Sequence, residues 1–337
     1  MSAAPAPTTF YREIARNRRN SWLLLAIVAV LFAVLGAAVG YAMDVGWVGA
    51  IVALCAAIAL SLGSYFAGDQ LVLGVSGAKE VDRANPPDEY RQLINVVEEM
   101  RLAGGLPPPK VYVIDDTAPN AFATGRDPKH ASVAATTGLL AKLNREELQG
   151  VIGHELSHVG NYDIRFALLV GVLVGGIALL SDFFLRFTFW GGGRRRDSDR
   201  SGGGGWITLV IFVIAIVLAI LAPIVSRMVQ LAVSRRRESL ADVSAVELTR
   251  NPVGLASALR RIADDPEVLE VANRATQHLY IVNPIKSFEA RAKSMWDTHP
   301  PIGERIRTLQ GIAGQIGMPF PAGLEAPGST QGLQPNR

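Results

Sequence analysis

Four long apolar stretches constrain the fold of this 337-residue chain more than any other feature. Residues 22–43, 45–67 and 206–226 contain no charged side chain, and residues 166–185 contain only Asp182. An α-helix of about 20 residues spans the hydrocarbon core of a bilayer, so each stretch predicts a transmembrane helix. Only the first 15 residues of 166–185 form an uninterrupted apolar run. We therefore expect this helix to be short, tilted or shielded by protein.

The first two stretches predict a transmembrane hairpin over residues 21–68. A cleaved signal peptide is the alternative, because four arginines between residues 12 and 19 precede the first stretch. That stretch has 22 residues, whereas the apolar part of a signal peptide has about 7–15. A second stretch follows after Asp44, so a retained hairpin is the favoured interpretation.

The basic residues predict the orientation, because cytoplasmic flanks of membrane helices are rich in arginine and lysine. They place residues 1–20 in the cytoplasm, and the hairpin returns the chain to that side. The glycine-rich loop 187–205 conflicts with this rule, since it carries four arginines although two more crossings would place it outside. Either the rule is violated here, or the second pair of apolar stretches within 164–226 does not cross fully.

Charge is distributed unevenly along the chain. Outside the four stretches, 251 residues carry 62 of the 63 charged side chains, about 25%, which is the share of an ordinary soluble domain. The formal net charge of +3 argues against a dedicated nucleic-acid-binding protein. The single cysteine, Cys55, excludes an intramolecular disulfide and an all-thiolate zinc site.

The polar segments predict a modest α+β domain in two parts, residues 69–163 and 227–318. A helix is expected to begin near 85–88, to follow an apolar stripe through Leu102 and to stop at Gly104–Gly105. Strands are expected at 110–114, 120–125 and 131–136. The tail 319–337 is rich in Pro, Gly and Gln and is expected to be disordered.

Residues 144–163 contain a metal-binding pattern on a predicted helix. Asn144 and Glu147 form a capping-box pattern at its start. His154 and His158 are four residues apart, so both imidazoles lie on one face and can chelate one Zn²⁺. Glu155 lies beside the first of them and can act as general base toward a water molecule. Such a pattern also arises by chance, so it needs a third ligand to support it.

The third ligand has to come from a distant part of the chain. Cys55 lies inside an apolar stretch, and no histidine closely follows His158. Glu238 and Asp242, just after the last apolar stretch, are four residues apart and face the same way on a helix. One carboxylate can bind the metal while the other accepts the N–H of a ligating histidine. A solvated helix with ordinary Arg–Glu pairs is the alternative.

Several segments together resemble one family, the HtpX-type membrane metalloproteases, which are related to the type I CAAX prenyl proteases. The segments are HELSHVGNYD at 154–163, RRRESLAD at 235–242, SMWDTHPPIGERI at 294–306, and the shorter segments 120–125 and 278–283. The four apolar stretches lie in the places that this family leads us to expect.

This resemblance implies a fold class: a mainly α membrane protein with four transmembrane helices and a zincin-like (gluzincin) α+β catalytic domain containing a small β-sheet. It implies one Zn²⁺ per chain, with His154, His158 and Glu238 as ligands and Glu155 as base. Asp242 matches an acid that supports a ligand. The implied location is a bacterial cytoplasmic membrane, with the catalytic domain on the cytoplasmic side.

The resemblance also suggests a place where substrate binds. Asn120, Ala121, Phe122 and Ala123 match an edge strand beside the cleft, and such a strand can bind an extended peptide by backbone pairing. A plain structural hairpin is the alternative for these residues.

Further side chains receive more than one interpretation. His299 can donate a hydrogen bond to the oxyanion of the reaction or simply start a helix at Pro300–Pro301. Arg305 matches a family arginine that can pair with site carboxylates or contact substrate. Asn161 and Asp163 can anchor the end of the metal-binding helix or orient a ligand. His130 and His278 receive no role.

The sequence therefore predicts a zinc metalloendopeptidase of the lipid bilayer that cleaves extended polypeptide segments of membrane or misfolded proteins, with a link to protein quality control and stress. A CAAX-type processing protease shares the zinc site but is expected to have more membrane spans. A non-enzymatic scaffold with a vestigial zinc site is the other alternative, although such sites usually lose a ligand or the base. No oligomeric state is predicted.

Overall fold

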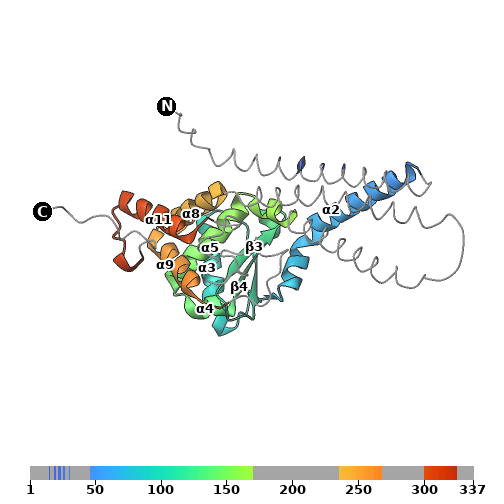
Figure 1. Cartoon of the computed structure of the whole chain (residues 1–337). Helices are drawn as coiled ribbons and strands as arrows, with labels where there is room; N and C mark the ends of the chain where they lie inside the picture. Colours follow the sequence, from blue (N-terminus) through green and yellow to red (C-terminus); the bar gives the residue numbers. More distant parts are fainter. Residues whose placement is uncertain are drawn as a thin grey trace, which may run out of the picture.

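A computed structural model describes residues 46–169, 235–267 and 300–324, together with six isolated positions between residues 15 and 30 (Figure 1). The loop 187–205, the apolar stretch 206–226, His278 and His299 lie outside the described residues, as do most of 22–43 and the tail after residue 324. Within the described parts, no helix has both the length and the apolar character that a membrane crossing requires.

The described elements alternate between helices and short strands in the first half of the chain and are helical afterwards. In chain order they are α2 (Val48–Val75), β1 (Lys79–Glu80), η1 (Asp88–Tyr90), α3 (Arg91–Ala103), β2 (Lys110–Ile114), β3 (Ala121–Gly125), η2 (Pro128–His130), β4 (Ala131–Thr136), α4 (Thr137–Lys142), α5 (Arg145–Gly160), α8 (Arg235–Thr249), α9 (Pro252–Asp264), α11 (Ile302–Gln315) and η4 (Ala322–Leu324). The expected helix before Gly104 and the three expected strands are present, and β3 begins one residue later than predicted.

The strands form one mixed sheet in the order β1-β2-β4-β3. Strand β2 runs parallel to β4, whereas β3 runs antiparallel to β4, with Phe122 opposite Ala134. Strand β3 therefore lies at an edge of the sheet, the position that the family resemblance implied for residues 120–123.

Side chains from the two faces of the sheet enter different cores, because successive residues of a strand point to opposite faces. Val111, Val133 and Ala123 pack with α3, α5 and α9 in the larger core. Ile114 and Phe122 pack on the other face with apolar residues near the end of α2. The sheet thus lies between a layer of helices and the end of α2 (Figure 1).

Helix α2 extends beyond the apolar stretch that predicted it. The stretch ends at residue 67, but the helix continues to Val75, and Val72 and Leu73 are buried against the sheet. The boundary expected at residue 68 therefore falls inside a continuous helix, because apolar contacts with the sheet stabilise its last two turns.

Two further expectations need correction. Leu102 was placed on the apolar stripe of the predicted helix, but it is 62% exposed, since the buried face of α3 ends at Met100. The tail was expected to be disordered from residue 319. Instead, Phe320 packs against the larger core and a 3₁₀ turn, η4, follows it, so the folded part extends to residue 324.

Candidate metal centre and active site

Helix α5 carries the predicted metal-binding pattern, and its start is fixed by the capping box that the sequence predicted. The Asn144 side chain accepts a hydrogen bond from the Glu147 backbone N–H at 3.0 Å, and Glu147 Oε2 accepts one from the Asn144 N–H at 2.9 Å. Glu147 is buried, and its other oxygen accepts a hydrogen bond from Arg261 of α9. These contacts fix the start of α5 and connect it to α9.

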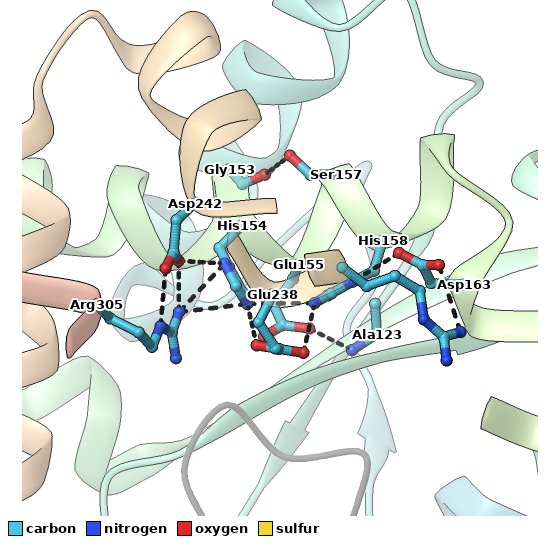
Figure 2. Close-up of polar contacts among 11 residues, drawn as sticks. Ala123, Gly153, His154, Glu155, Ser157, His158, Asp163, Glu238, Asp242 and Arg305 are labelled. Atoms are coloured by element: carbon cyan, nitrogen blue, oxygen red, sulfur yellow. Dashed lines mark hydrogen bonds and ion pairs between the residues drawn. The ribbon is translucent and has the colours of Figure 1, made fainter. Parts of the chain in front are cut away.

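Three side chains from two helices meet below α5 (Figure 2). The Nε2 atoms of His154 and His158 lie 3.2 Å apart. The two carboxylate oxygens of Glu238, on α8, lie 3.5 Å from His154 Nε2 and 3.6 Å from His158 Nε2. One donor atom from each residue lies within 4.8 Å of the others. The structure therefore brings together the three residues that the resemblance implied as ligands, His154, His158 and Glu238.

These spacings fit a zinc ion. Two ligand atoms about 2.0–2.1 Å from a tetrahedral zinc ion lie about 3.3–3.4 Å from one another. The 3.2 Å between the two Nε2 atoms is close to that value, and each Nε2 atom lies 3.5 or 3.6 Å from a different oxygen of Glu238. Two imidazoles and a carboxylate also leave a fourth position for water or substrate, as catalytic zinc sites require.

His154 is oriented by a buried carboxylate and a buried arginine. Its Nδ1 atom lies 2.9 Å from Asp242 Oδ1, one turn after Glu238 on α8. Arg305, on α11, donates from Nε and Nη2 to the two oxygens of Asp242 at 2.9 and 2.6 Å. Asp242 thus contacts the Nδ1 side of a candidate ligand, Arg305 pairs with a carboxylate of the site, and the Nε2 atom of His154 is left facing the candidate metal position.

His158 has a matching arrangement on the other side of the site. Its Nδ1 atom lies 3.0 Å from Asp163 Oδ2, and Asp163 Oδ1 lies 3.6 Å from Arg237 Nη1. Tyr162 turns the chain after α5 with a φ of 60°, a conformation that costs about 1–2 kcal/mol for a residue other than glycine. This turn brings the Asp163 side chain back to the end of α5, where it reaches His158.

Arg237 is a site residue that sequence reasoning missed. It is buried beside the ring of Phe166, 5.2 Å from the ring centroid, and it immediately precedes Glu238. Three consecutive arginines at 235–237 give no sign of which one faces the site. Its position directly before Glu238 is the signal that could have identified it, because one arginine of the run has to lie with Glu238 on the buried side of α8.

The side chains around the imidazoles favour positive charge. Burial and the charge of Arg305 lower the pKa of His154, but the bonds to Asp242 and Glu238 outweigh them and raise it to about 9. The pKa of His158 is raised as well, since Asp163 and Glu238 outweigh its burial. The pKa of Asp242 is lowered despite its burial, because Arg305 and His154 stabilise its charge. A cation is therefore the species that this cage of side chains suits.

Glu155 lies beside the candidate ligands and contacts the edge strand. Its Oε2 atom accepts a hydrogen bond from the backbone N–H of Ala123, at 2.9 Å. The Ala123 amide therefore points away from β4, toward the free edge of the sheet. The sequence placed both residues in the active site but did not predict this contact, because nothing in their spacing joins positions 32 residues apart.

The other predicted residues occupy varied places. Asn161 is buried and is the C-cap residue of α5. Asn120 directly precedes β3, and its side-chain oxygen accepts a hydrogen bond from the backbone N–H of Ala121, the first residue of that strand. The Phe122 side chain is buried on the face of the sheet that meets α2. His130 is exposed and pairs with Asp127 in the turn η2.

A comparison with protein families identifies the chain. The model of peptidase family M48 matches residues 87–313, which include both histidines, Glu155, Glu238 and Arg305. The chain belongs to peptidase family M48. It is therefore a hydrolase of peptide bonds, and the family together with the clustered donors makes it a metalloprotease.

Several known proteins are similar to this chain over most of its length. A "Protease HtpX homolog" of Dictyoglomus turgidum is 42% identical over 305 residues, which are 90% of this chain and 95% of the relative. A protein of the same description from Lactiplantibacillus plantarum is 44% identical over 90% of this chain and 99% of its own length. Among solved structures, "Crystal Structure of S. mikatae Ste24p" matches with 16% identity and a TM-score of 0.44, covering 88% of this chain and 66% of that one.

Proposed function

We propose that this M48 metalloprotease is a membrane-anchored zinc endopeptidase that cleaves extended segments of membrane or misfolded proteins. The observation that carries the proposal is the convergence of His154, His158 and Glu238 beside the carboxylate of Glu155. The two histidines and Glu238 are the proposed zinc ligands. The carboxylate of Glu155 beside them is a group suited to proton transfer.

Zinc in such a site polarises the scissile carbonyl and lowers the pKa of an attacking water. Glu155 is the proposed general base: it takes the proton of the water and delivers it to the leaving amine. Asp242 and Asp163 hold the Nδ1 sides of the two imidazoles, so the Nε2 atoms face inward. No residue of this arrangement has to form a covalent intermediate with the substrate.

The edge strand β3 is the proposed docking site for the substrate backbone. An extended peptide can add to the exposed edge of a sheet by main-chain hydrogen bonds. Ala123 faces that edge, and its amide already contacts Glu155, so a peptide bound there passes directly beside the base. This geometry supports unfolded or flexible segments as substrates.

The proposed membrane anchor consists of the four apolar stretches, with the catalytic domain on the cytoplasmic side. Within α2, large apolar side chains are exposed at Val48, Ile51, Val52, Ile58, Leu62 and Phe66. Water disfavours a row of such side chains along one helix, whereas lipid accommodates them. Their exposure supports contact between this part of the chain and lipid.

The function is tested by cleavage of casein by the purified full chain, together with metal analysis. The Glu155→Gln variant is expected to lose cleavage by at least about a hundredfold while its zinc content stays at the wild-type level, because only the proton acceptor is removed. Glu247→Gln, which changes an exposed carboxylate of α8, serves as the matched control and is expected to cleave normally.

Two outcomes of this experiment contradict the proposal. Cleavage that persists in Glu155→Gln excludes this residue as the base, and wild-type protein without stoichiometric zinc excludes the metal centre. A prenylated peptide is offered in a parallel reaction, because a processing protease would cleave it in preference to casein.

A further inference from the structure

Five side chains from three separate segments form a cluster outside the metal centre, which we name the arginine–aromatic cluster. Its members are Tyr65 and Phe66 on α2, Arg126 just after β3, and Tyr162 and Arg165 just after α5. None of these residues is a candidate ligand or base.

Both guanidinium groups of the cluster lie against aromatic rings. The Arg126 guanidinium carbon is 5.4 Å from the centroid of the Phe66 ring. That of Arg165 is 5.7 Å from the centroid of Tyr65 and 5.1 Å from that of Tyr162. The rings of Tyr65 and Phe66 meet edge to face, so the two arginines are held side by side along one surface of α2.

The cluster carries an excess of positive charge. Arg165 has no acidic partner among the described residues; its Nε donates to the backbone carbonyl of Arg126 at 2.6 Å. Arg126 has Asp127 at 3.9 Å, but that carboxylate lies closer to His130, at 2.8 Å, and also accepts two backbone N–H groups. Both arginine side chains are partly exposed, so an anion from outside the chain can reach them.

The cluster also marks a change in the character of α2. Before it, the helix exposes the apolar side chains named above. After it come the polar Asp69 and Gln70, and the apolar side chains that follow are exposed at Leu71 and Val75 and buried against the sheet at Val72 and Leu73. Tyrosine and arginine are typical of the level at which a membrane helix leaves the hydrocarbon and meets the headgroups. Guanidinium groups bind phosphate oxygens with two parallel hydrogen bonds.

We propose that the arginine–aromatic cluster binds the phosphate headgroup of an anionic phospholipid. This inference rests on the membrane anchoring proposed above. A lipid suits the site better than free phosphate because the exposed apolar side chains of α2 continue directly from the cluster, where acyl chains would lie. Phe66, 57% exposed, belongs to both surfaces.

Binding at this cluster has a consequence for the active site. Arg165 lies two residues after Asp163, which holds His158, and its contact with the Arg126 carbonyl ties it to the end of β3. A bound headgroup therefore anchors both the metal-binding helix and the proposed substrate strand at a set height above the bilayer.

The test compares phospholipids of equal chain length bound to the purified, zinc-loaded full chain in detergent, measured by native mass spectrometry. Wild-type protein is expected to retain phosphatidylglycerol over phosphatidylcholine. Arg126→Gln and Arg165→Gln are each expected to reduce that preference about fivefold, the usual contribution of one basic residue at an anionic surface. Arg260→Gln, which changes a partly exposed arginine of α9 outside the cluster, is the control and is expected to keep the preference.

Several outcomes overturn the inference: wild-type protein without the preference, glutamine variants that retain it, or inorganic phosphate at millimolar concentration that displaces the lipid. Arg126→Lys and Arg165→Lys keep the charge but lose the two parallel hydrogen bonds of the guanidinium, so their preference is expected to lie between that of wild type and that of the glutamine variants, which separates a lost contact from misfolding. Zinc content and casein cleavage are measured on the same preparations. If wild-type protein keeps the lipid preference but does not cleave casein, the proposed function is contradicted and the lipid site is not.

Discussion

Each candidate histidine ligand is supported by an aspartate that is paired with a buried arginine. A carboxylate removed from water is costly unless a positive charge compensates it, and Arg305 and Arg237 supply those charges for Asp242 and Asp163. The paired aspartate then fixes the ring orientation of its histidine, which is the usual task of a residue behind a metal ligand.

Removal of either arginine is expected to weaken metal binding without removing a ligand. Arg237→Gln and Arg305→Gln should each lower zinc affinity about 10- to 100-fold, the range for residues that orient metal ligands. Affinity is measured by competition with a chromophoric chelator, and cobalt substitution reports the ligand geometry by its visible spectrum. Arg307→Gln, an exposed arginine on the same helix as Arg305, should change neither. An unaltered affinity in Arg237→Gln would show that Asp163 needs no such partner.

Glu238 is expected to matter more than its supporting residues, because it is a proposed ligand. Glu238→Ala should reduce zinc affinity by more than about a hundredfold, beyond the range for a supporting residue. Zinc content after gel filtration measures this loss, with Glu247→Ala on the same helix as the control. Full occupancy in Glu238→Ala would rule out its assignment as the third ligand.

At the scale of elements, the position of α5 depends on its close approach to its neighbours. A Cβ atom on Gly150 would lie 2.7 Å from the backbone of Leu255 on α9, closer than atoms normally approach. Gly153 faces Ala245 of α8, the helix that carries Glu238. Gly150 thus lets α5 approach α9 closely, whereas a Cβ atom on Gly153 would make only ordinary contacts with α8, 3.5 Å from Thr249 and 3.6 Å from Ala245.

A methyl group at position 150 is therefore expected to push α5 and α9 apart. Gly150→Ala should reduce the free energy of unfolding by about 1–3 kcal/mol, as overpacked cores do. Gly311→Ala is the matched control, because that helical glycine of α11 has open space around it, and it should stabilise by about 0.5–1 kcal/mol. Denaturant unfolding measures both, and equal effects would contradict the packing argument.

At the scale of the whole molecule, the metal centre joins parts of the chain that are far apart in sequence. The proposed ligands come from α5 and α8, and Arg305 connects the same site to α11. A metal ion bound only by the folded state stabilises it by mass action, by about 2.7 kcal/mol at a hundredfold excess over its dissociation constant.

Chelation is therefore expected to lower the melting temperature of the zinc-loaded protein by several degrees. Calorimetry with and without a chelator measures this shift in detergent. The Glu238→Ala variant should melt at the same temperature in both conditions, since it holds little metal to remove. A wild-type melting temperature that is insensitive to chelator would show that the metal does not link these helices.

Local pattern by itself predicted a large part of the fold. The capping box, the strands and the common face of His154 and His158 follow from neighbouring residues, because helix and strand periods decide which side chains lie together. The same periodicity placed Glu238 and Asp242 on one side of α8, and burial of both excludes the solvated helix that was the alternative.

Only the tertiary structure decided which groups contact one another. The turn at Tyr162 brings Asp163 to His158, the packing of α8 buries Arg237 beside Asp163, and the Ala123 amide at the sheet edge donates to Glu155. Packing also extended α2 past its apolar stretch and placed the partly buried Phe320 against the core. Periodicity acts over a few residues, whereas each of these outcomes depends on how whole elements pack, and that is why the sequence could name the candidate ligands and base but not Arg237 or the contacts between distant elements.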